Sequence, residues 1–332
     1  MKVKTINQHS KIIQMNFSDV AKPNVNQKTA KTISKKIQFL NSLKGSKLKY
    51  KRFACSPLRY AGGKSLAVGF IIELIPNNVK KIVSPFFGGG SLEIACASML
   101  DIKVIGYDIF DILVNYWHVQ INQKQNLFDR LLAIKPTKEN YQTIKIALKK
   151  HWQQQELLDP LTLAVYYFFN HNLSYGPGFL GWMSSIYADE KKYQSALHKI
   201  NIFPSKNLSV KCQSFTQTLP QHNQDFLYLD PPYFLGGESK MFKGIYPQRN
   251  FPLHHNGFNH ILLADLLKKH QNGFILSYND CPKIRELYQD YKIIEVQWQY
   301  TMGQGETRIG KNRINKGDSH IKQSHEVLII NL

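Results

Sequence analysis

Two short strands joined by a glycine-rich turn and a helix constrain the fold of this 332-residue chain most. Residues 81–84 form a short apolar strand and residues 88–90 are all glycine. Residues 91–100 then have the apolar spacing of a helix, and residues 103–107 read as a second strand. A strand, helix and strand within about 30 residues make a βαβ unit, whose strands lie parallel in one sheet. The chain therefore contains an α/β domain.

More of this sheet is expected on both sides of the unit. Residues 65–75 have helical spacing and are closed by Pro76. The pattern predicts further strands at 226–229, 273–277, 291–298 and 326–331. No helical pattern separates the last two, so we expect an antiparallel pair joined by a long loop, and loops of such length are usually functional.

The middle of the chain departs from the α/β pattern. It looks helical from residue 111 to about 150, and residues 166–182 are then rich in aromatic residues, Asn and Gly. We predict that residues 111–214 are an inserted recognition region. The catalytic α/β domain would comprise residues 53–110 and 215–332, preceded by a basic extension at 1–52.

The charge is strongly positive, with 43 Lys and Arg against 23 Asp and Glu, or a formal +20. Residues 1–52 hold 13 of the basic residues and one acid, and residues 33–43 have helical spacing. A polyanion is the partner that such a surface favours, because Lys and Arg release counterions from phosphates. A basic surface that serves only solubility is the alternative.

The strand at 226–229 runs directly into Asp230, Pro231, Pro232 and Tyr233. The carboxyl ends of parallel strands are where ligands bind in open α/β sheets. The prolines stiffen the turn and offer no N–H donors. The Asp230 carboxylate and the Pro231 carbonyl could accept both hydrogens of an amino group while Tyr233 stacks on its ring. An ordinary Pro-Pro turn is the alternative.

A second pocket is expected at the glycine cluster, where Phe87 precedes Gly88 and Gly90. Backbone without Cβ atoms lets a ligand approach closely. The dinucleotide fingerprint G-x-G-x-x-G is absent, so a smaller nucleoside ligand fits better. Asp108 follows the next strand, where an acid can accept hydrogen bonds from both ribose hydroxyls.

Another turn of small residues, from Tyr60 to Lys64, precedes the first strand. It opens a helix whose positive end can carry an anion, so a ligand carboxylate would suit Lys64. The spacing of a Walker A loop is missing. A helix cap with a surface lysine is the alternative.

The motifs Tyr60-Ala-Gly-Gly-Lys64, Pro85-Phe-Phe-Gly-Gly-Gly-Ser91, Tyr107-Asp108, Asp230-Pro-Pro-Tyr233 and Ser277-Tyr-Asn-Asp280 occur here in the order of Dam-like, alpha-class (D12) DNA adenine-N6 methyltransferases. The chain resembles that family from about residue 53 to its end. The resemblance implies a Rossmann-like sheet of seven strands with an antiparallel last strand, and a helical target-recognition insertion. The recognition signature of GATC-methylating relatives is not legible near residues 172–182, so GATC is not inferred.

The resemblance also implies an activity. S-adenosyl-L-methionine would lie across the glycine loop, with its methionine part near Tyr60 and Lys64, its ribose on Asp108, and Asp230 between cofactor and substrate. An adenine flipped out of double-stranded DNA would receive the methyl group directly, with no covalent enzyme intermediate and no metal. Cytosine-N4 methylation is the close alternative, and a non-catalytic DNA-binding protein is another; RNA or protein methylation is less favoured.

Basic residues in two loops are candidates for DNA contact: Lys243, Arg249, Arg308, Lys311, Arg313 and Lys316. Residues 236–257, after the Asp-Pro-Pro-Tyr turn, are expected to form a lid over the flipped base. A restriction endonuclease is a possible partner, and the oligomeric state is left open. Four widely spaced cysteines without a C-x-x-C pair and the lack of a membrane-spanning run favour a cytoplasmic protein without structural zinc.

Overall fold

The computed structural model describes residues 34–45, 49–175, 178–186, 188–234, 258–296 and 326–332. Most of the predicted basic extension, the predicted lid and the long loop before the last strand lie outside these residues. All the elements below belong to the compact unit Ser34–Leu332.

A seven-stranded sheet forms the centre of the described structure, in the order β3-β2-β1-β4-β5-β7-β6. β1 to β5 are parallel along this order, and β7 is antiparallel to both β5 and β6. This confirms the predicted seven-stranded sheet, its antiparallel last strand and the pairing of the last two strands. The strands are β1 Lys81–Ser84, β2 Lys103–Asp108, β3 Leu208–Cys212, β4 Phe226–Leu229, β5 Phe274–Asn279, β6 Lys292–Val296 and β7 Glu326–Asn331.

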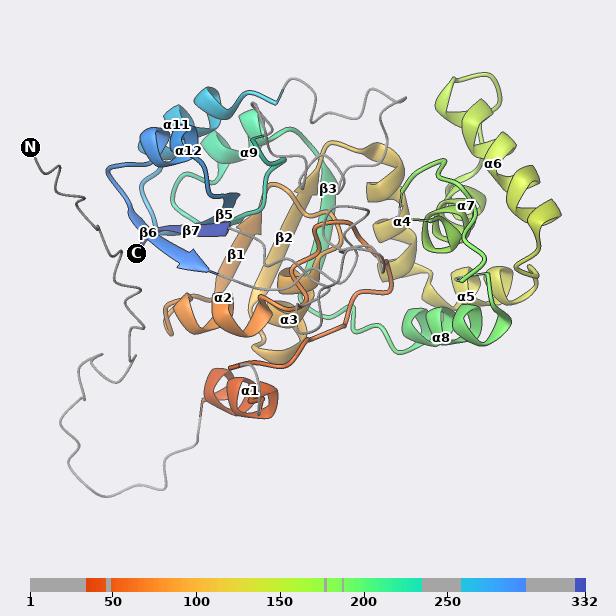
Figure 1. Ribbon diagram of the computed structural model, residues 1–332, viewed down its shortest axis with the longest axis horizontal. Coiled ribbons are helices and arrows are strands. Elements are labelled where there is room, and N and C mark those ends of the chain that lie inside the picture. Colours follow the sequence, from red (N-terminus) through yellow and green to blue (C-terminus); the bar gives the residue numbers. More distant parts are fainter. Residues whose placement is uncertain (1–33, 46–48, 176–177, 187, 235–257, 297–325) are drawn as a thin grey trace, which may run out of the picture. The chain divides into compact units, whose positions relative to one another are not determined.

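Helices cover both faces of the sheet (Figure 1). On one face lie α2 and α3, with α1 packed against them, and on the other lie α9, α11 and α12. The helix α1 confirms the helical spacing noted at 33–43. α2 begins later than predicted, because residues 65–67 form a turn. The bounds are α1 Lys35–Leu43, α2 Val68–Leu74, α3 Ser91–Met99, α9 Phe215–Gln221, α11 His260–Lys268 and α12 Pro282–Leu287.

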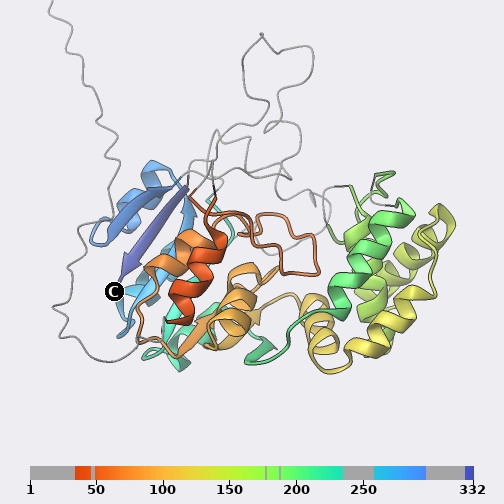
Figure 2. The ribbon, with the colours of Figure 1, turned by 90° about the horizontal axis from the view of Figure 1, so that it is seen from below.

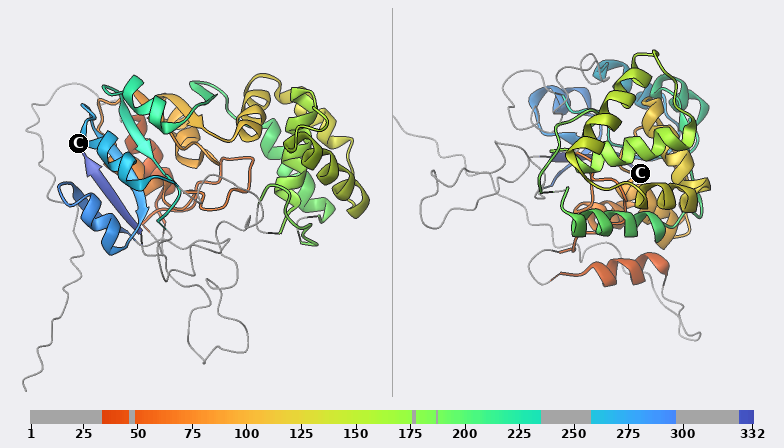
Figure 3. Two further views of the ribbon diagram at one scale, coloured as in Figure 1. Left: turned by 90° about the horizontal axis from the view of Figure 1, so that it is seen from above. Right: turned by 90° about the vertical axis from the view of Figure 1, so that its right-hand side faces the viewer.

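Five helices lie beside the β3 edge of the sheet, as Figures 2 and 3 show in yellow and green. α4 packs on β2 and β3, and it also contacts α7, which joins it to the rest of this group. Among the described residues, no helix has the length and apolar character needed to span a bilayer. The group comprises α4 Asp111–Asn122, α5 Lys124–Leu132, α6 Lys138–Trp152, α7 Pro160–Leu173 and α8 Glu190–Asn201.

The strand β3 falls within residues 111–214, which we predicted as the insertion, yet it pairs with β2 throughout its length. The helical part therefore ends before β3. The sequence signal was weak because β3 is an edge strand in which only Leu208 and Val210 are buried.

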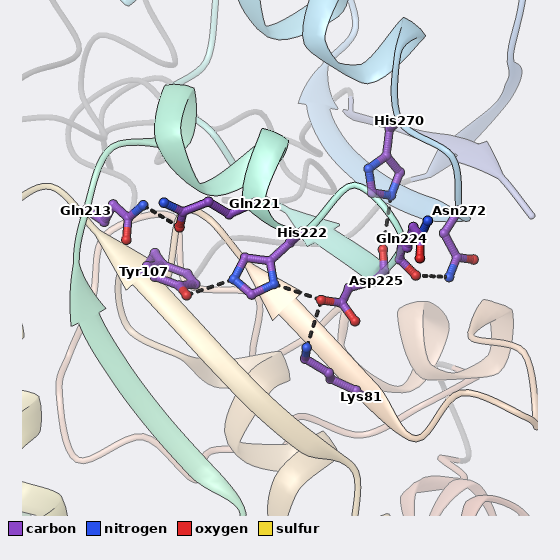
Figure 4. Close-up of polar contacts among 9 residues, drawn as sticks. All are labelled: Lys81, Tyr107, Gln213, Gln221, His222, Gln224, Asp225, His270 and Asn272. Atoms are coloured by element: carbon purple, nitrogen blue, oxygen red, sulfur yellow. Dashed lines mark hydrogen bonds and ion pairs between the residues drawn. The ribbon is translucent and has the colours of Figure 1, made fainter.

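A polar network joins three strands near the amino end of β4 (Figure 4). The carboxylate oxygen Oδ2 of Asp225 lies 2.7 Å from Nζ of Lys81 and 2.7 Å from Nδ1 of His222. The other ring nitrogen of His222 lies 2.8 Å from the Tyr107 hydroxyl. His270 also donates to the main-chain carbonyl of Asp225 across 3.0 Å. Asp225 thus fixes the start of the strand whose other end carries Asp230.

Candidate active site

A cavity of about 430 Å³ opens over the carboxyl ends of the parallel strands. Asp108 at the end of β2 and Asp230 directly after β4 both line it. The register of β1 between these strands brings the two ends to the same edge. A volume of this size falls in the range of small-molecule and cofactor sites, and it suits a nucleoside-sized ligand.

Lys64 and Asp230 form a close ion pair in the lining of this cavity. Nζ of Lys64 lies 2.7 Å from Oδ1 and 2.9 Å from Oδ2 of Asp230, and it donates to the Gly62 carbonyl across 3.2 Å. The Lys64 side chain is 4% exposed and that of Asp230 is 22% exposed. Burial raises the pKa of the Asp230 carboxyl group, and Lys64 opposes this rise. The sequence suggested a ligand carboxylate for Lys64; the structure places the Asp230 carboxylate there.

The turn after β4 presents Asp230, Pro232 and Tyr233 to the cavity. Pro231 is buried and is not among the lining residues, so the predicted role of its carbonyl stays a prediction. The Tyr233 ring is held under Lys64, whose Nζ lies 5.0 Å from the ring centroid. A lysine over an aromatic face is a favourable contact.

Asn279 at the end of β5 fixes the chain that leaves this turn. Its side chain accepts from the Phe234 N–H across 2.9 Å and donates to the Phe234 carbonyl across 3.1 Å. Because Asn279 is 2% exposed, water does not compete for these bonds. The Ser277-Tyr-Asn-Asp280 motif therefore positions the Asp-Pro-Pro-Tyr turn.

The glycine loop requires glycine at two of its positions. Gly88 has a φ of +47° and Gly90 has a φ of +64°, which L side chains rarely adopt. A Cβ atom at Gly88 would lie 2.8 Å from the Tyr60 ring, and one at Gly90 would lie 2.6 Å from Phe87. Tyr60 therefore packs directly on the loop, and Phe87 packs behind it; both line the cavity.

Asp108 holds the glycine loop in place. Its Oδ2 accepts from the Gly88 N–H across 2.9 Å, and its Oδ1 accepts from the Phe110 N–H across 3.0 Å. Each carboxylate oxygen keeps further lone-pair capacity for a ligand hydroxyl. The predicted cofactor residues Tyr60, Lys64, Phe87, Gly88, Gly90, Asp108 and Asp230 all line the same cavity.

The helical group closes one side of the cavity, which the sequence did not reveal. Tyr167, His171 and Phe179 are lining residues. The His171 ring stacks between Tyr60 and Tyr167, with centroid distances of 5.8 and 5.2 Å. Burial lowers the pKa of His171 to about 3, so the ring is neutral and donates through Nε2 to the Arg59 carbonyl. The aromatic run in this region was the available signal.

Glu93 is a cavity residue that we did not predict from the sequence. It is the only acid in the first turn of α3, where an acidic residue is common because it interacts favourably with the helix dipole. In the structure it is 3% exposed, lines the cavity and accepts from the Ser84 hydroxyl across 2.6 Å. Burial raises the pKa of this carboxyl group to about 7.

Comparison with known proteins identifies the family of this chain. Residues 60–302 match the family model of the D12 class N6 adenine-specific DNA methyltransferases. The chain belongs to this family. The match begins at Tyr60 and so covers the cavity residues from the first motif through the Asp-Pro-Pro-Tyr turn.

Two curated methylases are similar to this D12-class chain. It is 24% identical to Modification methylase StsI of Streptococcus sanguinis, over 99% of this chain and 49% of the relative. It is 28% identical to Type II methyltransferase M.FokI of Planomicrobium okeanokoites, over 61% of this chain and 33% of the relative. The chain thus spans at most about half the length of these relatives.

The residues of the D12-class chain that we predicted to contact DNA lie outside the described residues. They are Lys243, Arg249, Arg308, Lys311, Arg313 and Lys316, and the predicted lid lies there with them. Their roles stay predictions. Within the described ranges, no group of three or more His, Cys, Asp or Glu side chains is arranged to hold a metal ion.

Proposed function

We propose that this chain transfers a methyl group from S-adenosyl-L-methionine to the N6 amino group of an adenine flipped out of double-stranded DNA. The observation that carries the proposal is the buried Lys64–Asp230 pair, which presents a carboxylate to a nucleoside-sized cavity. Family membership supports the same reaction.

The residues around the cavity fit the cofactor. Asp108 can accept from ribose hydroxyls while it holds the glycine loop, and Gly88 and Gly90 let a ligand lie against the backbone. Tyr60 adds an aromatic face on the same side. When bound, S-adenosyl-L-methionine supplies an electrophilic methyl group on a sulfonium sulfur.

Asp230 acts on the acceptor amino group. The lone pair of an adenine amino nitrogen is delocalised into the ring, which makes this nitrogen a poor nucleophile. A carboxylate that accepts one of its hydrogens draws the lone pair toward the methyl group, and preorganised acceptors of this kind are a main source of rate. Lys64 opposes the rise in the pKa of Asp230 that burial causes, and so favours the ionised carboxylate. Tyr233 lines the same cavity and offers its ring to the base. No covalent bond to the enzyme is needed.

The helical group is proposed as the target-recognition region. An isolated bridge pairs Ser174 with Met183, and between them the Trp182 side chain is 81% exposed. Nζ of Lys145 lies 5.2 Å from the Trp182 ring centroid, and Tyr175 nearby is 59% exposed. Aromatic rings beside cations favour contact with bases and phosphates. We also propose a modification role with a cognate restriction endonuclease, as the relatives' names suggest.

The proposal is tested by incubating the protein with duplex DNA and labelled S-adenosyl-L-methionine, then digesting the DNA to nucleosides. We expect N6-methyladenine from the wild type and a loss of at least about 10²-fold in rate for Asp230→Ala. Asp265→Asn, an exposed acid on α11, is the control and should match the wild type. Detection of N4-methylcytosine instead would contradict the proposal and support cytosine-N4 methylation. DNA binding without any transfer would favour a non-catalytic binding protein.

A further inference from the structure

Glu93 is a buried carboxyl group to which the proposed methyl transfer gives no role. It lines the cavity, and its hydrogen bonds come from the Ser84 hydroxyl and from its own backbone N–H. None of the ion pairs among the described residues includes it. A buried carboxylate without a cation is costly, so the group is stable only if it is protonated or acquires a positive partner.

Among the residues that the structure describes, none near Glu93 supplies such a partner. Lys64 is the cation that acts on it, but Lys64 is already paired with both oxygens of Asp230. The other titratable groups that interact with it are Cys55, Cys96 and Tyr228, and burial raises the pKa of each, so all three are neutral at pH 7. The charges of Lys64 and Asp230 cancel, which leaves the charge of Glu93 unbalanced.

We propose that Glu93 is the counter-charge for the sulfonium group of S-adenosyl-L-methionine, and that it releases its proton when this cofactor binds. The inference rests on the proposed function, which brings a sulfonium into this cavity. A sulfonium carries a permanent positive charge and has no proton to lose. It would enter a site whose Lys64–Asp230 pair is balanced, where the ionised form of Glu93 is the anion that offsets it.

The pKa of Glu93 allows it to lose a proton on cofactor binding near neutral pH. Burial raises it to about 7, while the bond from Ser84 and the nearby Lys64 hold it down and Asp230 raises it further. A cation bound nearby favours the ionised form and lowers the pKa, so its binding is coupled to loss of a proton. Glu93 would therefore be partly protonated in the empty site and ionised with the cofactor.

Methyl transfer would also change the protonation of Glu93. The carbon–sulfur bond breaks and its electron pair stays on sulfur, so the sulfonium charge disappears. The amino lone pair forms the nitrogen–carbon bond, and one amino proton leaves. Glu93 has then lost its counter-ion, so its pKa returns to about 7. At pH 7 it takes up about half of this proton and solvent takes the rest, while the sulfur of the product S-adenosylhomocysteine is neutral.

The test is calorimetric binding of the purified wild-type chain, without DNA, in phosphate and in Tris. At pH 7 we expect S-adenosyl-L-methionine to release about half a proton more than S-adenosylhomocysteine, because a group with a pKa near 7 is half protonated there. The affinity for S-adenosyl-L-methionine relative to S-adenosylhomocysteine should rise about tenfold from pH 6 to pH 8. The two ligands share their amino-acid part, so its titration cancels in this comparison.

Two variants distinguish proton release by Glu93 from a purely structural role of this residue. Glu93→Gln should abolish the extra proton release and flatten the pH dependence, with affinity for S-adenosylhomocysteine within about twofold of the wild type. Ser84→Ala removes a bond that stabilises the carboxylate, so it should keep the proton release but move its midpoint to higher pH. Glu286→Gln, an exposed acid on α12, is the matched control and should behave as the wild type.

The outcomes distinguish this inference from the proposed function. Binding of S-adenosyl-L-methionine with no extra proton release would overturn the role of Glu93 and leave the proposed function intact. Absence of binding by the folded wild type would overturn both. If Glu93→Gln fails to fold, the wild type and Ser84→Ala decide, because a midpoint that Ser84→Ala does not move would also overturn the inference.

Discussion

Nζ of Lys64 lies within 2.9 Å of both carboxylate oxygens of Asp230, so a single buried ammonium group holds the candidate catalytic carboxylate by both its atoms. Each oxygen can still accept another hydrogen bond, because a carboxylate has about four lone-pair positions. Lys64 therefore fixes the orientation of Asp230 without using up its capacity to accept. It also opposes the rise in the pKa of this carboxyl group that burial causes.

The first prediction concerns the pH dependence of the proposed reaction. Burial raises the pKa of Asp230 and Lys64 opposes this rise, so Lys64→Met should raise the pKa further. The reaction needs the ionised carboxylate, and the acid limb of the pH–rate profile should therefore shift to higher pH. We expect kcat at pH 7.5 to fall about 10²-fold and to recover partly in more alkaline buffer.

Lys80→Met is the control for this change, because it makes the same substitution at an exposed lysine. Its profile should overlay that of the wild type. A Lys64→Met enzyme with reduced kcat but an unmoved acid limb would show that Lys64 does not set the ionisation of Asp230.

The second prediction concerns Asp108, which accepts from two backbone N–H groups, those of Gly88 and Phe110. In Asp108→Asn one acceptor oxygen becomes an NH₂ donor that faces an N–H. We expect a loss of about 1–3 kcal/mol in the free energy of unfolding and at least about tenfold weaker binding of S-adenosyl-L-methionine. Denaturant unfolding and calorimetry measure the two effects. Unchanged cofactor affinity would contradict the proposed ribose contact.

The sheet was predictable because its strands carry strong local signals. Residues 226–229 are all apolar and all buried, and the glycine cluster leaves few alternatives for the turn between β1 and α3. β3 was not predicted, because an edge strand with alternating exposure has no continuous apolar run. Strand ends were predictable as ligand sites because parallel strands share one edge.

Part of the site depended on contacts between residues far apart in the sequence, which the sequence does not reveal. The pairing of Lys64 with Asp230 spans 166 positions, and His171 reaches the cavity because α7 lies against Tyr60. Whether the Lys64 side chain faces a ligand or an acid of the same chain depends on that packing. The burial of Glu93, likewise, follows from the packing of α3 on α2 and β2, which brings Glu93 to Ser84 at the end of β1.

The third prediction concerns stability in acid, set by the network at Asp225. Burial alone would raise the pKa of Asp225, but its bonds to Lys81 and His222 outweigh this and lower it. A carboxylate with a lowered pKa in the folded state stabilises the fold above its unfolded pKa, and this contribution disappears as the pH falls through the folded pKa. Asp225→Asn should therefore cost about 1–3 kcal/mol at pH 7 and less near pH 3, below the unfolded pKa.

Urea unfolding at both pH values checks this result. Gln224→Glu is the control, because Gln224 is next to Asp225 in the chain and does not bond to Lys81. It should not reproduce the loss in the free energy of unfolding. An equal loss at the two pH values would show that Asp225 acts through packing and not through its charge.

The fourth prediction concerns Trp182, which is proposed to contact DNA from the helical group. Trp182→Ala should weaken binding of duplex DNA by about 1–3 kcal/mol, since an aromatic ring stacked on a base contributes about that much, and Trp182→Phe should retain part of it. The side chain is 81% exposed, so neither change should alter the melting temperature by more than about 2 °C. Ile202→Ala, an exposed apolar residue at the end of α8, is the control. Fluorescence anisotropy with a labelled duplex measures the affinity, and an unchanged affinity for Trp182→Ala would place the recognition surface elsewhere on the chain.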